Sequence, residues 1–352
     1  MKYLSSDILS LTREAGVMIE KNRISYANSE ARQILGADCV GKSVSRVFGE
    51  ELAQAQASSF VGGVNIGGKM YTVRTAKAED AQVMLFSPFE VSVNLVNDAF
   101  IYLLNDGMSV IGAGIDSGRN RAELIGDTQM LGSFAHMTRA YFRMQRLANN
   151  AASIARLNEG ALSCSIAPVD LSRIYSETVS MISSMFPDVE FRTELGSGIC
   201  INADYDLAQQ ILLNLVSNSL IHAKGRSRIS VSLRESTTGV YLSVSDNGAG
   251  MSETELKNVF ERYKYGFAIR EMSGGAGFGM TVCAGAAKLH GGTVMIESRE
   301  GHGTMVRVSF AKNLKCGLVL HSEEQQAVEL KTVLTGLSDC LPTEYFDEKY
   351  MD

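Results

Sequence analysis

Residues 246–250 (DNGAG) place one carboxylate and two glycines directly after the strand-like run GVYLSVS. A second glycine-rich stretch, SGGAGFGM, follows at 273–280. A carboxylate at a strand end can accept a hydrogen bond from a ring amine, and glycine lets the backbone approach a ligand closely. This order of groups indicates a nucleotide site. DNG is also a strong turn signal, so Asp246 has a purely structural interpretation as well.

Two asparagines precede these loops in the helical stretch ILLNLVSNSLIHA. Asn214 and Asn218 are four residues apart, so their amides project from one helix face. Neutral amide oxygens suit a Mg²⁺ ion that keeps most of its waters and shares phosphate oxygens. The alternative is that both are ordinary polar residues of a helix surface.

The surrounding patterns predict a multidomain α+β protein. Residues 1–88 alternate short strands and helices, which predicts a small mixed unit. Turn residues are rare in 89–160, where two helical stretches predict a helical hairpin. We expect the two stretches to separate around 116–121 (DSGRNR). Helices and strands then alternate to 312, which predicts an α/β sandwich over 161–312. In the extension 313–352 we expect one strand, one helix and an acidic tail, and none of the three carries a chemical motif.

The motif order resembles the GHKL ATPase family in its sensor-histidine-kinase branch. The series is an Asn-bearing helix, SDNGAGM, SGGAGFGM, HGGTVMIES and GHGTMVRVSF, over about 170–310. The resemblance implies ATP and Mg²⁺ as cofactors. It assigns Mg²⁺ coordination to Asn218, places Asn214 beside the phosphates as a catalytic and binding residue, and assigns the adenine amino group to Asp246.

The same resemblance implies roles for the loops. Gly248 and Gly250 would let the backbone pass under the base, with Met251 near it. The run 259–275 would form a lid over ATP. The next helix would begin at three glycines, where free N–H groups favour phosphate, namely Gly275, Gly277 and Gly279. Thr304 is either a nucleotide neighbour or only the first residue of a strand.

One residue departs from the family pattern. Family members commonly carry a lysine three residues beyond the second asparagine, whereas this chain has Ile221. Lys224 is the next cation along the chain, but it points in another direction on a helix. Nucleotide binding is therefore expected to be weaker or arranged differently.

Residues 16–48 resemble a PAS domain. The stretch GVMIEKNRISYANSEARQILGADCVGKSVSRVF has the family's strand, turn, strand, N-x-x-A-x-x-x-L-G helix and G-K-S step. The resemblance implies a PAS-like sensor domain at 1–88 ahead of a dimerising hairpin at 89–160.

The hairpin lacks the usual phosphoacceptor. A histidine kinase needs a nucleophilic histidine on the first hairpin helix, and the stretch 89–116 contains none. His136 is the one candidate, but it lies in the second stretch without an acidic neighbour, so an ordinary helix histidine is the alternative. His290 ends a helix, where a cation would suit the helix dipole.

Three functions remain open. The first is a sensor histidine kinase that phosphorylates a histidine for relay to a response regulator receiver domain, as a homodimer through the hairpin. The second is an ATP-binding pseudokinase of the same architecture. The third is a GHKL protein that phosphorylates a partner or uses ATP as a clamp, and the PAS-like unit and hairpin disfavour it.

Bulk composition excludes several other classes. The 352 residues carry a formal net charge of −6, which does not favour nucleic acid as a partner. Six cysteines are scattered singly, which predicts reduced thiols. The sequence contains no uncharged apolar stretch of the ~20 residues that a membrane-spanning helix needs. Its N-terminus lacks the apolar core of a signal peptide. We therefore expect a cytoplasmic protein without a membrane-spanning segment.

Overall fold

The fold is taken from a computed structural model that describes most of the chain. The described residues are 9, 12, 14–48, 60–67, 69–78, 81–88, 98–159, 164–222, 227–256, 259, 278–312 and 327–346. None of the helices among them is both long enough and apolar enough to cross a membrane.

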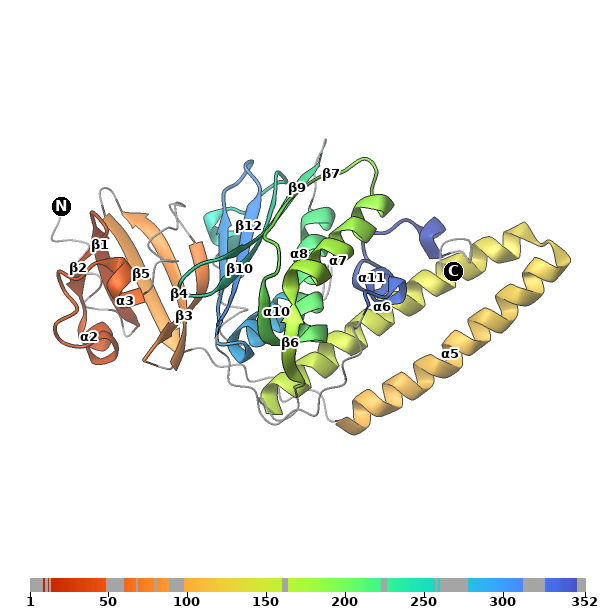
Figure 1. The fold of residues 1–352 in the computed structure, drawn as a ribbon, viewed down its shortest axis with the longest axis horizontal. Coiled ribbons are helices and arrows are strands. Elements are labelled where there is room, and N and C mark those ends of the chain that lie inside the picture. Colours follow the sequence, from red (N-terminus) through yellow and green to blue (C-terminus); the bar gives the residue numbers. More distant parts are fainter. Residues whose placement is uncertain are drawn as a thin grey trace.

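Between residues 14 and 88, the described part of the N-terminal unit contains a five-stranded antiparallel sheet and two short helices (Figure 1). Its elements are β1(Ala15–Glu20), β2(Arg23–Ala27), α2(Ser29–Leu35), α3(Val44–Phe48), β3(Phe60–Ile66), β4(Lys69–Ala78) and β5(Ala81–Pro88), in the sheet order β2-β1-β5-β4-β3. Asn28 fixes the start of α2, because its Oδ1 accepts the N–H groups of both Ala31 and Gly16 at 2.9 Å. The predicted mixed α+β unit is confirmed.

Two long helices form the predicted hairpin, α5(Asp98–Ile125) and α6(Thr128–Glu159). The expected break around 116–121 is wrong, because α5 continues through these residues. Gly118 belongs to the contact between the two helices, since a Cβ there would lie 2.4 Å from the Phe134 ring. The turn comes instead at Gly126, which has φ +70°, and Asp127 then caps α6 by accepting the N–H of Met130 at 2.9 Å.

The third unit is a sandwich of helices over a mixed sheet. It contains β6(Ile166–Asp170), α7(Leu171–Met185), β7(Glu190–Leu195), β8(Cys200–Asp204), α8(Tyr205–Ile221), β9(Arg228–Glu235), β10(Val240–Asp246), α10(Phe278–Leu289), β11(Val294–Ser298) and β12(Thr304–Phe310). The helices α7, α8 and α10 lie on one side of the strands (Figure 1). Only the β7–β9 pair is parallel among the described strand pairs of this sheet. The predicted α/β sandwich is confirmed.

The sheet of the N-terminal unit and the main sheet of the sandwich, β11-β12-β10-β9-β7, are one continuous ten-stranded sheet, whereas β6 and β8 form a separate two-stranded sheet. They join where β3 pairs antiparallel with β11, and Gly62 lies opposite Met295. A Cβ at position 62 would lie 2.8 Å from the Val294 carbonyl oxygen, so glycine permits this approach. Met295 is 2% exposed and packs in the core of the N-terminal unit. The sequence did not predict this junction.

The C-terminal segment 327–346 packs between α6 and the sandwich (Figure 1). It contains α11(Leu330–Gly336) and the 3₁₀ helix η3(Thr343–Phe346). Its buried apolar residues belong to the same core as α7 and α8, and they are Val333, Leu334, Leu337, Leu341 and Phe346. The predicted helix is present, and the predicted strand lies outside the described residues.

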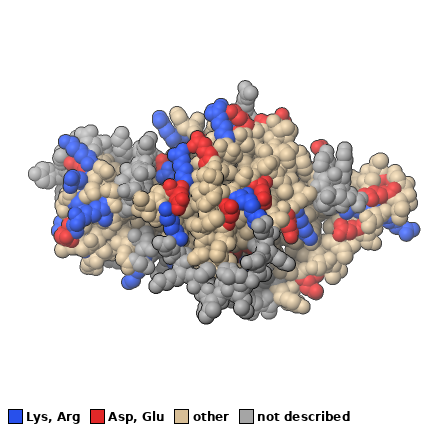
Figure 2. Space-filling model, viewed as in Figure 1, with Lys and Arg blue, Asp and Glu red and all other residues tan. Residues whose placement is uncertain are grey.

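The charged side chains are mixed in sign. On the face seen in Figure 2, basic and acidic residues alternate over the described part of the surface, and neither sign gathers into a large patch. Ion pairs on β7 and β9 show the same pattern, since Glu190 contacts both Arg192 at 2.7 Å and Arg228 at 3.0 Å.

Candidate nucleotide site

Asp246 ends β10 and organises the polar end of the sheet. Its Oδ1 accepts the backbone N–H of Gly248 at 2.9 Å and that of Thr304 at 3.2 Å. Its Oδ2 accepts the Ser219 hydroxyl of α8 at 3.2 Å. Each carboxylate oxygen has two lone pairs, so Oδ2 retains acceptor capacity for a further donor. The turn interpretation and the ligand interpretation of Asp246 are therefore compatible.

The glycines of this region permit close backbone packing. A Cβ at Gly248 would lie 2.6 Å from the His222 carbonyl oxygen. Gly250 has φ +64°, and a Cβ there would lie 2.0 Å from the Arg299 carbonyl oxygen. Glycine is thus required at both positions by the protein itself. The passage of a base over them stays a prediction.

The turn that precedes β12 is tied to the same loop. Met251 donates its N–H to the Ser298 hydroxyl at 2.9 Å, and Ser298 lies 2.8 Å from the Thr304 hydroxyl. Because Thr304 also binds Asp246 through its backbone, the structure brings Asp246, Met251 and Thr304 together. Ser219 and Ser298 were not singled out from the sequence, since single serines carry no motif.

Asn214 is buried on α8 at 2% exposure. Its Nδ2 donates to the Gly279 carbonyl at 3.4 Å in the first turn of α10, and a Cβ at Gly279 would lie 3.0 Å from Asn214 Oδ1. Asn214 is therefore next to the helix start that the sequence assigned to phosphate. Beside it, burial raises the pKa of the Cys283 thiol to about 12, so this cysteine stays protonated at neutral pH.

Asn218 is half-buried one turn further along α8. The described residues contain no group of three or more His, Cys, Asp or Glu side chains that could hold a metal. One neutral amide still fits Mg²⁺, which usually keeps several waters and takes few protein ligands beside phosphate. Asn218 is thus chemically suited to the predicted ion.

Part of the predicted site lies outside the described residues. This is true of Gly275 and Gly277, of Lys224, and of the lid apart from Val259.

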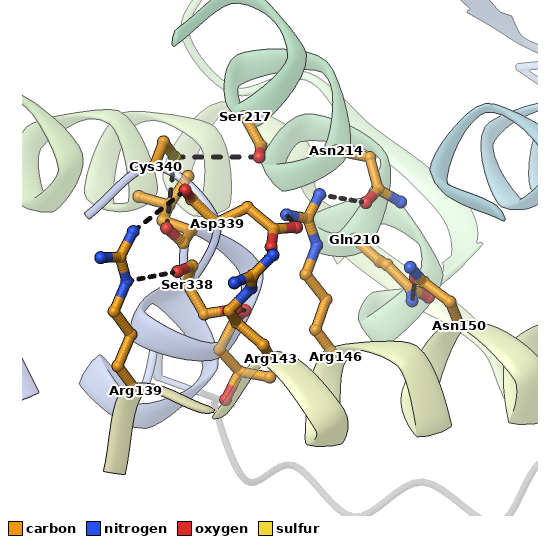
Figure 3. A network of polar contacts seen from close by, with 12 residues as sticks. Arg139, Arg143, Arg146, Asn150, Gln210, Asn214, Ser217, Ser338, Asp339 and Cys340 are labelled. Carbon is orange, nitrogen blue, oxygen red and sulfur yellow. Dashed lines mark hydrogen bonds and ion pairs between the residues drawn. The ribbon is translucent and has the colours of Figure 1, made fainter. Parts of the chain in front are cut away.

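Three arginines of α6 connect the hairpin to the C-terminal segment and to Asn214 (Figure 3). Arg143 Nε lies 2.7 Å from Asp339 Oδ1, and Arg146 Nη1 lies 2.8 Å from Asp339 Oδ2. Arg139 donates to the backbone carbonyl of Asp339 at 3.3 Å. Arg146 Nη2 also donates to Asn214 Oδ1 at 3.4 Å. The spacing of the arginines on one helix face is visible in the sequence, but their partners are not.

A polar cavity of about 420 Å³ lies between α6, α8 and α11. Arg146 and Asn214 border it, together with Asn150 and Gln210. Gln210 Nε2 donates to Asn150 Oδ1 at 2.8 Å, which links α6 to α8 across the cavity wall. The cavity is large enough for several waters, whose share of liquid volume is about 30 Å³ each.

The histidines occupy contrasting positions. His136 is exposed on α6. His290 is fully buried, which corrects the expectation of a cation at a helix end. Its Nε2 accepts the N–H of Asp204 at 2.9 Å, and its Nδ1 lies 2.6 Å from the Ala286 carbonyl. Burial lowers the pKa of His290, because desolvation disfavours the charged form. It is therefore a neutral structural residue.

Residues 203–314 match the family model of the histidine kinase-, DNA gyrase B-, and HSP90-like ATPases. The matched range includes Asn214, Asn218, Asp246 and Thr304. The resemblance to the ATPase domain of sensor histidine kinases, predicted from the motifs, is thereby confirmed for this part of the chain.

Similar proteins carry the names of sensor kinases. Sensor-like histidine kinase SenX3 of Mycobacterium tuberculosis is 32% identical over 139 residues, which are 39% of this chain and 34% of that protein. Probable sensor histidine kinase TcrY of the same species is 30% identical over 162 residues, 46% of this chain and 34% of that protein. The matches thus span about a third of the length of these relatives.

Among solved structures, full-length ShkA in complex with AMPPNP is similar with a TM-score of 0.46 and 21% identity, over 61% of this chain and 47% of that one.

Proposed function

We propose that the chain is the ATP–Mg²⁺-binding core of a cytoplasmic two-component sensor histidine kinase. The observation that carries the proposal is the cluster of Asp246, Gly248 and Thr304 at the end of β10, inside the range that matches the ATPase family. Sensor kinases among the similar proteins favour this function over a clamp-type ATPase.

The roles of the side chains follow from their positions. Asp246 Oδ2 would accept the adenine amino group, since Ser219 uses only part of its acceptor capacity. Asn214 would lie beside the phosphates at the start of α10, where unpaired N–H groups favour negative charge. Asn218 would hold Mg²⁺. The bound nucleotide would supply a phosphoryl group for transfer.

His136 is the proposed acceptor in the kinase. It is exposed on α6, so a phosphoryl donor from outside its own hairpin could reach it. The second candidate function is a pseudokinase that binds ATP and signals without phosphorylating itself. It is favoured by a sequence fact, because the first helix α5(Asp98–Ile125) contains no histidine.

The remaining units complete the proposal. The N-terminal unit would be the PAS-like sensor, and the hairpin would dimerise through the apolar side chains that α5 exposes. These include Tyr102, Leu103, Val110 and Leu124, each at least 67% exposed. Large apolar side chains left open on one helix indicate a protein partner. The partner for relay would be a response regulator receiver domain.

Labelled ATP separates the two candidate functions. The purified chain is incubated with γ-labelled ATP and Mg²⁺ beside His136→Ala, and acid-labile label on the protein is measured. If the wild-type chain carries label and His136→Ala does not, the chain is a kinase with His136 as its acceptor. ATP binding without label supports the pseudokinase. If ATP does not bind at all, or binds equally well to Asn218→Ala, the proposed site is wrong.

A further inference from the structure

Arg146 brings a positive charge from the hairpin to the candidate nucleotide site. We propose that its guanidinium is a phosphate-binding group of that site, and that Asp339 of the C-terminal segment holds it until a nucleotide arrives. The inference rests on the proposed function, because it concerns the same site.

The surroundings of Arg146 are polar but only partly satisfy its charge. Its side chain is largely buried, so its charge needs partners. One partner is the Asp339 carboxylate at 2.8 Å, and the other is the neutral Asn214 amide oxygen at 3.4 Å. The second contact is long for a charged donor. One edge of the guanidinium is therefore directed at Asn214 without a strong partner of its own.

Asn214 links this guanidinium to the start of α10. Its oxygen faces Arg146, while its Nδ2 contacts the Gly279 carbonyl in the first turn of α10. The first N–H groups of a helix lack intrahelical partners and attract phosphate. Arg146 and this helix start thus flank the same asparagine, so one phosphate chain could contact both.

The site otherwise lacks a cation on α8. Ile221 stands where family members commonly have lysine, and it is 44% exposed. The sequence of α8, YDLAQQILLNLVSNSLI, contains no lysine or arginine. A guanidinium is well suited to replace that lysine, because its planar donors match phosphate oxygens. Arg146 would supply from α6 the charge that α8 does not carry.

Asp339 can release Arg146 without losing its own charge partner. Arg143 holds Oδ1 at 2.7 Å, whereas Arg146 holds Oδ2. Asp339 would therefore not become an unpaired carboxylate, which would be costly at a partly buried site. The cavity beside Arg146 and Asn214 gives the guanidinium room to move. The C-terminal segment then acts as an internal competitor of the phosphates.

The test is a titration of the full chain with ATP–Mg²⁺ and, separately, with adenosine. Arg146→Gln removes the charge but keeps a donor toward Asn214, and we expect ATP affinity to fall at least about tenfold, as a charged hydrogen bond is worth. Adenosine affinity should stay unchanged, because adenosine has no phosphate. Asp339→Asn should raise ATP affinity, because it removes the competing anion.

Arg143→Gln is the matched control, since Arg143 binds the same carboxylate but does not touch Asn214. It should weaken ATP binding less than Arg146→Gln does, because it acts only through the Asp339 carboxylate and removes no phosphate-binding group. Circular dichroism verifies the fold. Arg146→Lys keeps the positive charge, so it should lose less ATP affinity than Arg146→Gln, and it is the variant to titrate if Arg146→Gln does not fold. Wild-type affinity in Arg146→Gln, equal loss for adenosine, or no gain in Asp339→Asn would each overturn the inference. Failure of the wild-type chain to bind ATP would instead overturn the proposed function itself.

Discussion

Asp246 accepts the backbone N–H of Thr304 at 3.2 Å, although 58 residues separate them along the chain. The carboxylate therefore holds the start of β12 as well as offering an acceptor to a ligand. A substitution that tests ligand binding by Asp246 therefore has to preserve its hydrogen bond to the N–H of Thr304.

Asp246→Asn is the substitution that does so. The amide oxygen at the Oδ1 position still accepts the N–H groups of Gly248 and Thr304, whereas the amide NH₂ at the Oδ2 position cannot accept the adenine amine. We expect ATP affinity to fall about tenfold or more with little change in thermal stability, measured by calorimetry. Asp246→Ala should lose both properties. Undiminished ATP affinity in Asp246→Asn would remove adenine recognition from Asp246.

The open apolar face of α5 gives a prediction about assembly. The pair Leu103→Asp and Val110→Asp places charges on side chains that are 67% and 70% exposed in the single chain. If the hairpin dimerises there, the double variant should be monomeric by light scattering, with an unchanged far-ultraviolet spectrum. Thr237→Asp, at an exposed turn between β9 and β10, is the control and should leave the mass unchanged. A wild-type chain that is itself monomeric would contradict the proposed dimer.

Two glycines of α5 should respond in opposite directions to the same substitution. Gly114 has open space around its Cβ position, so Gly114→Ala should stabilise the helix by about 1 kcal/mol. At Gly118 the added methyl would lie 2.4 Å from the Phe134 ring, and crowding of this kind costs about 1–3 kcal/mol. Gly118→Ala should therefore gain less than Gly114→Ala or destabilise the chain, in urea unfolding. Equal gains at both positions would mean that the two helices do not pack as described.

Stability should depend on pH through His290. Its folded pKa lies below the ordinary value of about 6.5, so the unfolded chain binds a proton at a higher pH than the folded chain does. The free energy of unfolding is therefore unaffected well above pH 6.5 and falls as the pH drops below it, by at most about 1.4 kcal/mol per unit for this group. His290→Gln should be less stable but should lose that part of the slope. An unchanged slope would assign the dependence to other groups.

The sequence predicted the features whose signals are local. Asp246, Gly248 and Gly250 form one short motif after a strand, and Asn214 and Asn218 share a helix face, so spacing alone groups each set. The contact between Asp246 and Thr304 was not predicted, because the sequence leaves Thr304 as either a nucleotide neighbour or the first residue of a strand. The hairpin turn was expected too early, around 116–121, whereas α5 continues through these residues to Ile125 and the turn comes at Gly126.

The missed features depend on partners far along the chain. Asp339 lies 193 residues from Arg146, and neither residue type signals the other. His290 carries a helix-end pattern that suits a cation, but packing buries it against the N–H of Asp204. Burial of this kind is a property of the assembled core, so periodicity within one helix does not reveal it.

The pairing of β3 with β11 has a consequence for how the chain can be divided. The pairing of Gly62 with Met295 closes a loop that contains the hairpin and most of the sandwich, and closing so long a loop is slow and entropically costly. Either half prepared alone would present an open strand edge, and unpaired edges template aggregation. The isolated ATPase half would also expose Met295, which the complete chain buries. The N-terminal unit thus covers the β11 edge of the sheet of its neighbour.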